Sequence, residues 1–87
     1  MENEDKVVKS FDLKRITKST RFPLICVYKN PKDFPGKYIA RLWDVDRPTN
    51  IVAIAESLEE IREAKPPDMV IMQRQPQDDP VIVETWI

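Results

Sequence analysis

The residue types that carry most enzyme chemistry are nearly absent from this chain. It has no histidine, one cysteine and one glycine among its 87 residues. Histidine is the commonest general base near neutral pH, and glycine-rich loops form most phosphate-binding cradles, so both kinds of site are excluded. The single thiol, Cys26, lies inside an apolar run, which is typical of a packed and inert cysteine. We therefore expect no enzymatic activity and no cofactor.

Two pairs of aspartates are the remaining candidates for inorganic chemistry. Asp44 and Asp46 stand two residues apart, and Asp78 is followed directly by Asp79. Carboxylate oxygens are the ligands that Mg²⁺ and Ca²⁺ prefer. Both pairs also fall in predicted turns, where aspartates usually accept hydrogen bonds from their own backbone. The turn interpretation is favoured, and we expect no metal site.

Recognition by large aromatic and cationic side chains is the chemistry that remains. Two strand-like segments near residues 41 and 84 each place alternate residues on one sheet face. A further strand-like segment over 69–75 could add Arg74 to them. A stretch at 30–37 holds an aromatic residue between prolines. Tryptophan and arginine are the residues most enriched at interface hot spots. The candidate partner-binding residues are Phe34, Arg41, Trp43, Arg74, Glu84 and Trp86.

A plainer interpretation of the same residues stays open. Trp43 and Trp86 would then be ordinary core residues, and Arg41 and Glu84 would form an edge ion pair worth about 0 to 1 kcal/mol. Phe34 would fold inward against the end of the sheet. The two interpretations differ in what truncation of a tryptophan does: loss of folding in one case, loss of partner binding in the other.

The elements that position these residues are predicted from apolar runs and turn signals. Runs rich in β-branched and aromatic residues predict strands over 22–29, 37–45, 51–55, 69–75 and 81–87. Turns are predicted between them, including one over 46–50. Ser57 and Glu60 form a capping box that starts a helix of about eight residues, and Pro66 with Pro67 forbids its continuation.

The predicted fold class is α+β, with the order β-β-β-α-β-β. We expect a single antiparallel or mixed sheet of about five strands with one short helix. The helix should return the chain across one face by a right-handed crossover and deliver the fourth strand parallel to a neighbour. Residues 21–87 form the single domain that a chain of this length allows. Residues 1–20 show no clean period and are left as an N-terminal arm, flexible or folded.

The central strands are apolar on both faces. Three apolar residues are consecutive at 25–27 and four at 51–54, where a sheet with one face in water should alternate. One short helix covers only part of one face. The second face therefore needs the N-terminal arm, a second protomer or a partner to cover it.

Charge is distributed unevenly along the chain. Residues 9–47 carry ten Lys or Arg against four Asp or Glu, whereas residues 56–87 carry three against eight. Tyr28, Tyr38 and Trp43 alternate with basic residues, which would suit base stacking beside phosphate contacts. The asymmetry also fits two halves that pair within one fold or across a dimer, and the net charge of −1 favours that interpretation.

Two segments resemble known families. The stretch 22–50 and the ending 78–87 are similar to a family of small bacterial proteins of unknown function, and the likeness spans 22–87. The helix start at Ser57–Glu60 is similar to the S/T-L-E-E segment of HicB-type antitoxin domains, whose glycine pattern ahead of the helix is absent here. The first resemblance implies a bacterial setting, and the second implies an antitoxin-like role.

Location and function are predicted from these features together. The lone cysteine indicates a reducing compartment, the acidic start differs from a signal peptide, and no apolar run approaches the ~20 residues that span a bilayer. We expect a cytoplasmic, non-enzymatic protein–protein interaction module, monomeric or homodimeric, using one sheet face or the free strand edge near the C-terminus. The alternative is a nucleic-acid-associated accessory or antitoxin-like protein that uses basic residues of 9–47.

Overall fold

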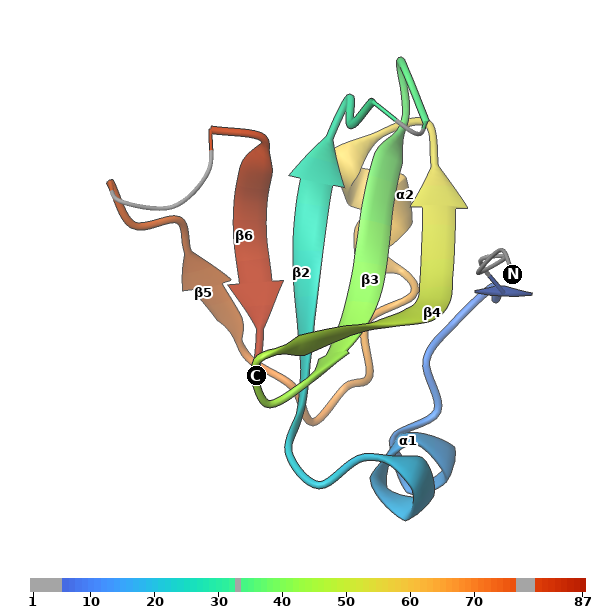
Figure 1. Cartoon of the computed structure of the whole chain (residues 1–87). Coiled ribbons are helices and arrows are strands. Elements are labelled where there is room, and N and C mark those ends of the chain that lie inside the picture. The colour runs from blue at the N-terminus through green and yellow to red at the C-terminus, as the bar shows by residue number, and fades with distance from the viewer. Residues whose placement is uncertain (1–5, 33, 77–79) are drawn as a thin grey trace, which may run out of the picture.

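One mixed sheet and two short helices make up the fold (Figure 1). The computed structural model describes residues 6–32, 34–76 and 80–87. The elements in chain order are β1 (Lys6–Val7), α1 (Leu13–Ser19), β2 (Pro23–Lys29), β3 (Tyr38–Asp44), β4 (Arg47–Ala55), α2 (Leu58–Arg62), β5 (Ile71–Gln73) and β6 (Ile82–Trp86).

The sheet has the strand order β1-β4-β3-β2-β6-β5. Its pairs are antiparallel except β1 with β4, which is parallel. The predicted α+β class is confirmed at this level. The described residues form six strands rather than five and two helices rather than one, because the arm left unassigned supplies β1 and α1.

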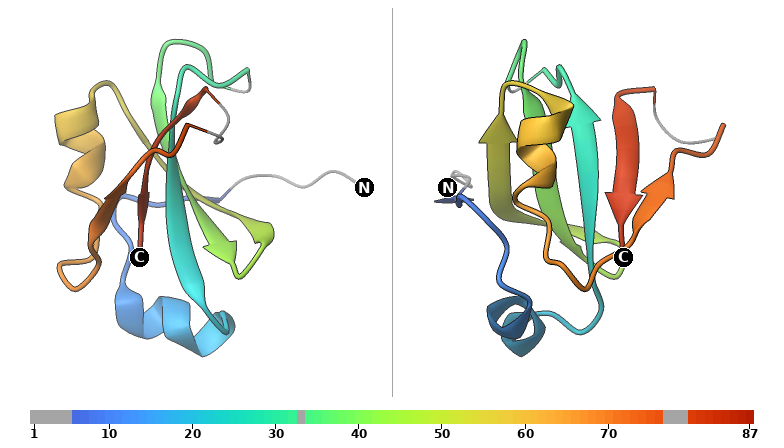
Figure 2. Two further views of the ribbon diagram at one scale, coloured as in Figure 1. Left: turned by 90° about the vertical axis from the view of Figure 1, so that its left-hand side faces the viewer. Right: turned by 180° about the vertical axis from the view of Figure 1, so that it is seen from behind.

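The connection from β4 to β5 departs in part from the expectation. In the view from behind, α2 lies in front of the sheet, with β4 to its left and β5 to its right (Figure 2). Both strands run upwards in this view, so the crossover is right-handed as predicted. The prediction that this strand pairs parallel with a neighbour is wrong. β5 lies at the far edge of the sheet and pairs antiparallel with β6, because β6 takes the place beside β2.

The turn predicted over 46–50 is also wrong. The turn between β3 and β4 is Val45–Asp46, and β4 already begins at Arg47. The register of β3 with β4 shifts between Arg41 and Trp43, where β4 bends sharply. Thr49 Oγ1 donates to the Leu42 carbonyl at 2.7 Å, so a side chain replaces the ladder bond that the bend removes.

Helix α2 begins with the predicted cap. Ser57 Oγ accepts from the Glu60 backbone N–H at 3.1 Å, and Glu60 Oε1 accepts from the Glu56 N–H at 2.8 Å. The helix is shorter than expected, because it ends at Arg62 in a turn before Pro66. Ile61 is its buried residue and places the helix against the core of the sheet.

The N-terminal segment completes the cover on the helix side. The Phe11 N–H donates to the Ala64 carbonyl at 3.0 Å, and the Phe11 ring meets the Trp86 ring edge-on at 6.5 Å between centroids. Ile16 of α1 is buried in the same core cluster. The apolar residues of this arm therefore close the side that α2 only partly covers.

Candidate protein-binding site

The two faces of the sheet are covered differently. Cross-strand partners share a face, so the pairs of β2 with β3 assign each residue to one side. We call the α2 side the back face and the other side the open face. No helix among the described residues lies over the open face (Figure 2). The central residues of the open face are Cys26, Tyr28, Ile39, Arg41 and Trp43.

Tyr28 and Trp43 form the aromatic centre of the open face. Trp43 Nε1 donates to Tyr28 Oη at 3.1 Å, and both side chains are half-buried. Burial raises the pKa of the Tyr28 hydroxyl to about 12, so this group stays a neutral donor and acceptor across the physiological range. Two rings with a fixed polar tip can hold an apolar ligand and orient it.

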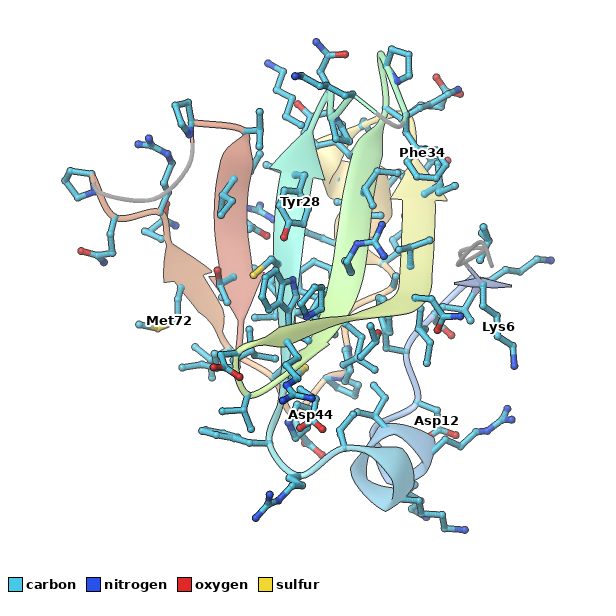
Figure 3. The ribbon with its side chains drawn as sticks, viewed as in Figure 1. Lys6, Asp12, Tyr28, Phe34, Asp44 and Met72 are labelled. Carbon is cyan, nitrogen blue, oxygen red and sulfur yellow. The ribbon has the colours of Figure 1, made fainter. Side chains whose placement is uncertain are left out.

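A hollow opens beside this aromatic pair. It has a volume of about 140 Å³ and is lined by Tyr28, Pro31, Phe34, Ile39 and Arg41. The side chain of Tyr28 stands out from the sheet towards the viewer (Figure 3). Phe34 lies higher in this view, near the start of β3 and the end of β4. Aromatic, proline and aliphatic walls with a single cation make this an apolar site with one polar anchor.

Phe34 is held there by its loop. The loop closes through Asn30 Oδ1, which accepts from the Gly36 N–H at 2.6 Å, and through the Phe34 carbonyl, which accepts from Lys37 N at 3.2 Å. Gly36 has a φ of 80°, a conformation that glycine tolerates without strain. Phe34 is half-buried and lines the hollow, so the loop is folded over the sheet end rather than projecting freely.

Arg41 supports the bend of β4. Its Nη1 donates to the Thr49 carbonyl at 2.7 Å across the shifted register. The guanidinium therefore fixes one wall of the hollow, and its stem contributes apolar surface to that wall.

Trp86 and Glu84 do not join the open face, which corrects the expectation of one shared surface. Leu24 pairs with Trp43, whereas the adjacent Ile25 pairs with Trp86, so the two tryptophans point to opposite sides. Trp86 is fully buried in the core on the back face. The sequence pattern could not give this result, because it does not fix the register of β2 against two partners.

Glu84 is buried beside Trp86 and has two partners. Arg62 of α2 donates to it from Nε at 3.0 Å and from Nη2 at 2.6 Å, and Trp86 Nε1 donates at 2.8 Å. Burial alone would raise the pKa of Glu84, but these donors outweigh it and lower the pKa. The contact with Glu84 raises the pKa of Arg62. The predicted edge ion pair between Arg41 and Glu84 is wrong, since these residues lie on opposite faces.

The other expected residues lie away from the hollow. Arg74 is exposed just after β5, and Tyr38 packs against the core cluster of the back face. Asp44 Oδ1 accepts from the backbone N–H groups of Arg21 and Phe22, which are distant in sequence, so this aspartate ties the start of β2 to the end of β3 rather than its own turn. Asp78 and Asp79 lie outside the described residues.

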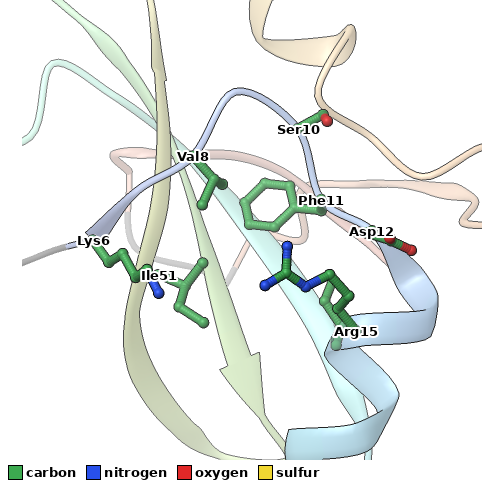
Figure 4. A pocket seen from close by; sticks show the side chains of 8 residues that line it. Lys6, Val8, Ser10, Phe11, Asp12, Arg15 and Ile51 are labelled. Carbon is green, nitrogen blue, oxygen red and sulfur yellow. The ribbon is translucent and has the colours of Figure 1, made fainter.

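A second hollow lies between the N-terminal segment and β4. It has a volume of about 230 Å³, with apolar walls from Val8, Phe11 and Ile51 and with Lys6 and Arg15 at its rim (Figure 4). The region around it is strongly basic. Six exposed cations and one aspartate are the charged residues of 6–21, namely Lys6, Lys9, Asp12, Lys14, Arg15, Lys18 and Arg21.

Comparisons with known proteins add no relative. No family model, no curated protein and no solved structure matches this chain. Neither helix in the described part of the chain has the length and apolar character needed to cross a bilayer. The two family resemblances and the cytoplasmic location stay predictions.

Proposed function

We propose that the protein is a binding module whose open face takes an extended, apolar segment of a partner protein. One observation carries the proposal: an aromatic hollow lies on the one sheet face that no described helix covers. Tyr28 and Phe34 line this hollow, and the Trp43 indole N–H donates to the Tyr28 hydroxyl and holds it in place. Surfaces of this composition bind partners through a few large side chains set in pockets.

The polar groups of the hollow favour an extended backbone as the ligand. The Tyr28 hydroxyl accepts from Trp43, and it can turn its own proton from the neighbouring Cys26 sulfur to a ligand carbonyl. Aromatic grooves with such donors recognise extended and proline-containing peptides, whose backbone carbonyls stay unpaired. A segment of this kind would seat an apolar side chain against Phe34 and a carbonyl at Tyr28.

Selection from a random peptide library displayed on phage tests the proposal. We expect enriched peptides with apolar or proline-containing cores, and binding should fall at least tenfold in the Phe34→Ser variant while the thermal midpoint changes little. Phe22→Ser is the matched control, because Phe22 is 62% exposed and does not line the hollow. Equal binding by wild type and Phe34→Ser would contradict the proposed site.

A nucleic-acid-associated role is the second candidate, and the basic N-terminal segment favours it. The six cations of 6–21 are all exposed, and the one aspartate there accepts the Lys14 N–H as a helix cap. Counterion release predicts that binding through these cations weakens steeply between 50 and 200 mM salt. Binding of an apolar peptide to the open face should respond little to the same change, so a salt titration separates the two roles.

A further inference from the structure

The outer edge of β5 differs from the other edge of the sheet. β1, at the opposite edge, carries Lys6, a charge of the kind that keeps strand edges from pairing. The β5 edge has no charge from Val70 to Gln73, and its apolar side chains are exposed, with Val70 at 62% and Met72 at 44%. Met72 lies at the margin of the open face, at the far side of β5 (Figure 3).

The hydrogen-bond pattern determines which backbone groups face outward from β5. Val70 and Ile87 exchange both backbone bonds, at 2.6 and 2.9 Å, so they form a hydrogen-bonded antiparallel pair. Such pairs recur every second residue, which makes Met72 with Thr85 the next one. The N–H and C=O groups of Ile71 and Gln73 therefore point away from β6, towards the open edge.

We infer that the β5 edge pairs antiparallel with the β5 edge of a second copy of this chain, with Met72 on the twofold axis. In this register Ile71 of each copy forms a hydrogen-bonded pair with Gln73 of the other, giving about four hydrogen bonds in total. The two Met72 side chains meet on the open face. The contact is isologous and closes after two copies.

Charge complementarity selects the antiparallel arrangement. Asp68 precedes β5 and Arg74 follows it. Antiparallel pairing brings Asp68 of one copy near Arg74 of the other, whereas a parallel pair would place like charges together. Because the twofold axis runs perpendicular to the sheet, both open faces lie on the same side of one continuous twelve-stranded sheet. The inference rests on the edge alone and stands whether or not the open face binds a peptide.

A disulfide trap tests the register directly. Two residues on the axis of a non-hydrogen-bonded pair have Cα atoms about 4.5 Å apart, a separation that a disulfide accommodates. In a background where Cys26 is replaced by valine, Met72→Cys should form a disulfide-linked dimer as the main product of mild oxidation. Ile87→Cys is the matched control, because Ile87 is exposed on the adjacent strand but far from its own copy in this register. Equal dimer yields from the two variants would overturn the inference.

A proline substitution tests the outward backbone groups. The Gln73 N–H points away from β6, so Gln73→Pro should leave the β5–β6 ladder intact and remove the bond to the second copy. Sedimentation equilibrium should give a dimer for wild type and for Gln73→Ala, and a monomer with an unchanged circular dichroism spectrum for Gln73→Pro. A monomeric wild type, or a folded Gln73→Pro dimer, would contradict the pairing. Library-selected peptides should still bind the Gln73→Pro monomer, so the failure of one proposal leaves the other testable.

Discussion

The two tryptophans of this protein occupy opposite faces of one sheet, and their surroundings differ in kind. Trp86 is fully buried, meets Phe11 edge-on and donates to a paired carboxylate. Trp43 is half-buried and donates to Tyr28 beside a hollow that is open to solvent. The back face thus forms the packed core, and the open face leaves part of its aromatic surface in contact with water.

Truncation of each tryptophan should separate the two faces most strongly. Trp86→Ala should lower the free energy of unfolding by about 3 to 5 kcal/mol, because it empties the centre of the core. Trp43→Ala should cost less, about 1 to 2 kcal/mol, since part of that side chain is already in contact with water. Urea denaturation measures both values. Similar losses for the two variants would remove the contrast between the faces.

The buried ion pair of the back face gives the next largest effect. Arg62→Met leaves the Glu84 carboxylate buried without its cation and should cost about 3 kcal/mol. Glu84→Gln keeps an acceptor for Trp86 and should cost less. If Arg62→Met unfolds at the wild-type urea concentration, the pair does not stabilise the back face.

The same carboxylate makes stability depend on acidic pH. The folded state lowers the pKa of Glu84, so its contribution is complete above the unfolded value of about 4.3 and is lost as the pH falls through the folded pKa. Wild type should therefore lose stability below about pH 4 more steeply than Glu84→Gln does. Thermal midpoints measured from pH 7 down to pH 3 check this, and parallel curves would show that Glu84 contributes no such dependence.

The open face should give a smaller dependence at the alkaline end. Burial raises the pKa of Tyr28 to about 12, so the neutral hydroxyl contributes stability below pH 10, and this contribution is lost as the pH rises through the folded pKa. Tyr28→Phe should cost less than about 1 kcal/mol at pH 7 and should flatten the decline above pH 10. A tyrosine absorbance titration of the Tyr38→Phe variant, which leaves Tyr28 alone, should give a midpoint near 12.

The last expected effect is a gain in stability. Val45 has a φ of 59°, and a β-branched residue is strained in this left-handed region. Val45→Gly should raise the free energy of unfolding by about 1 kcal/mol, because glycine adopts that conformation freely. Val45→Ala is the control that keeps a Cβ atom and should recover little of this gain. An unchanged midpoint in both variants would show that the turn carries no strain.

Local chemistry predicted much of the fold. The five strands, the helix cap at Ser57 and the apolar character of both faces follow from neighbouring residues, which the sequence displays directly. The bend of β4 was missed, because it depends on the contacts of Thr49 and Arg41 with distant partners. The sixth strand and the second helix were missed because β1 and α1 have too few residues to show a period.

The candidate site was predicted only in part for a related reason. Arg41 and Phe34 line one hollow, and Trp43 lies beside it on the strand of Arg41, bonded to Tyr28 of the hollow wall. We expected Trp86 and Glu84 on the same surface as Arg41 and Trp43. Alternation along a strand, however, determines only which residues of that strand lie on one face together. Which face they share depends on register with β2, and register depends on the whole core.

The central claim is that the open face binds and the back face does not, and the two indole N–H groups report on it within one spectrum. In a ¹H–¹⁵N correlation spectrum of the protein, each tryptophan gives one side-chain signal, which Trp43→Phe assigns. Titration with a library-selected peptide should shift the Trp43 signal, because its N–H is bonded to Tyr28 in the wall of the hollow, and leave the Trp86 signal in place. Movement of the Trp86 signal alone, or saturated binding that moves neither, would contradict the account.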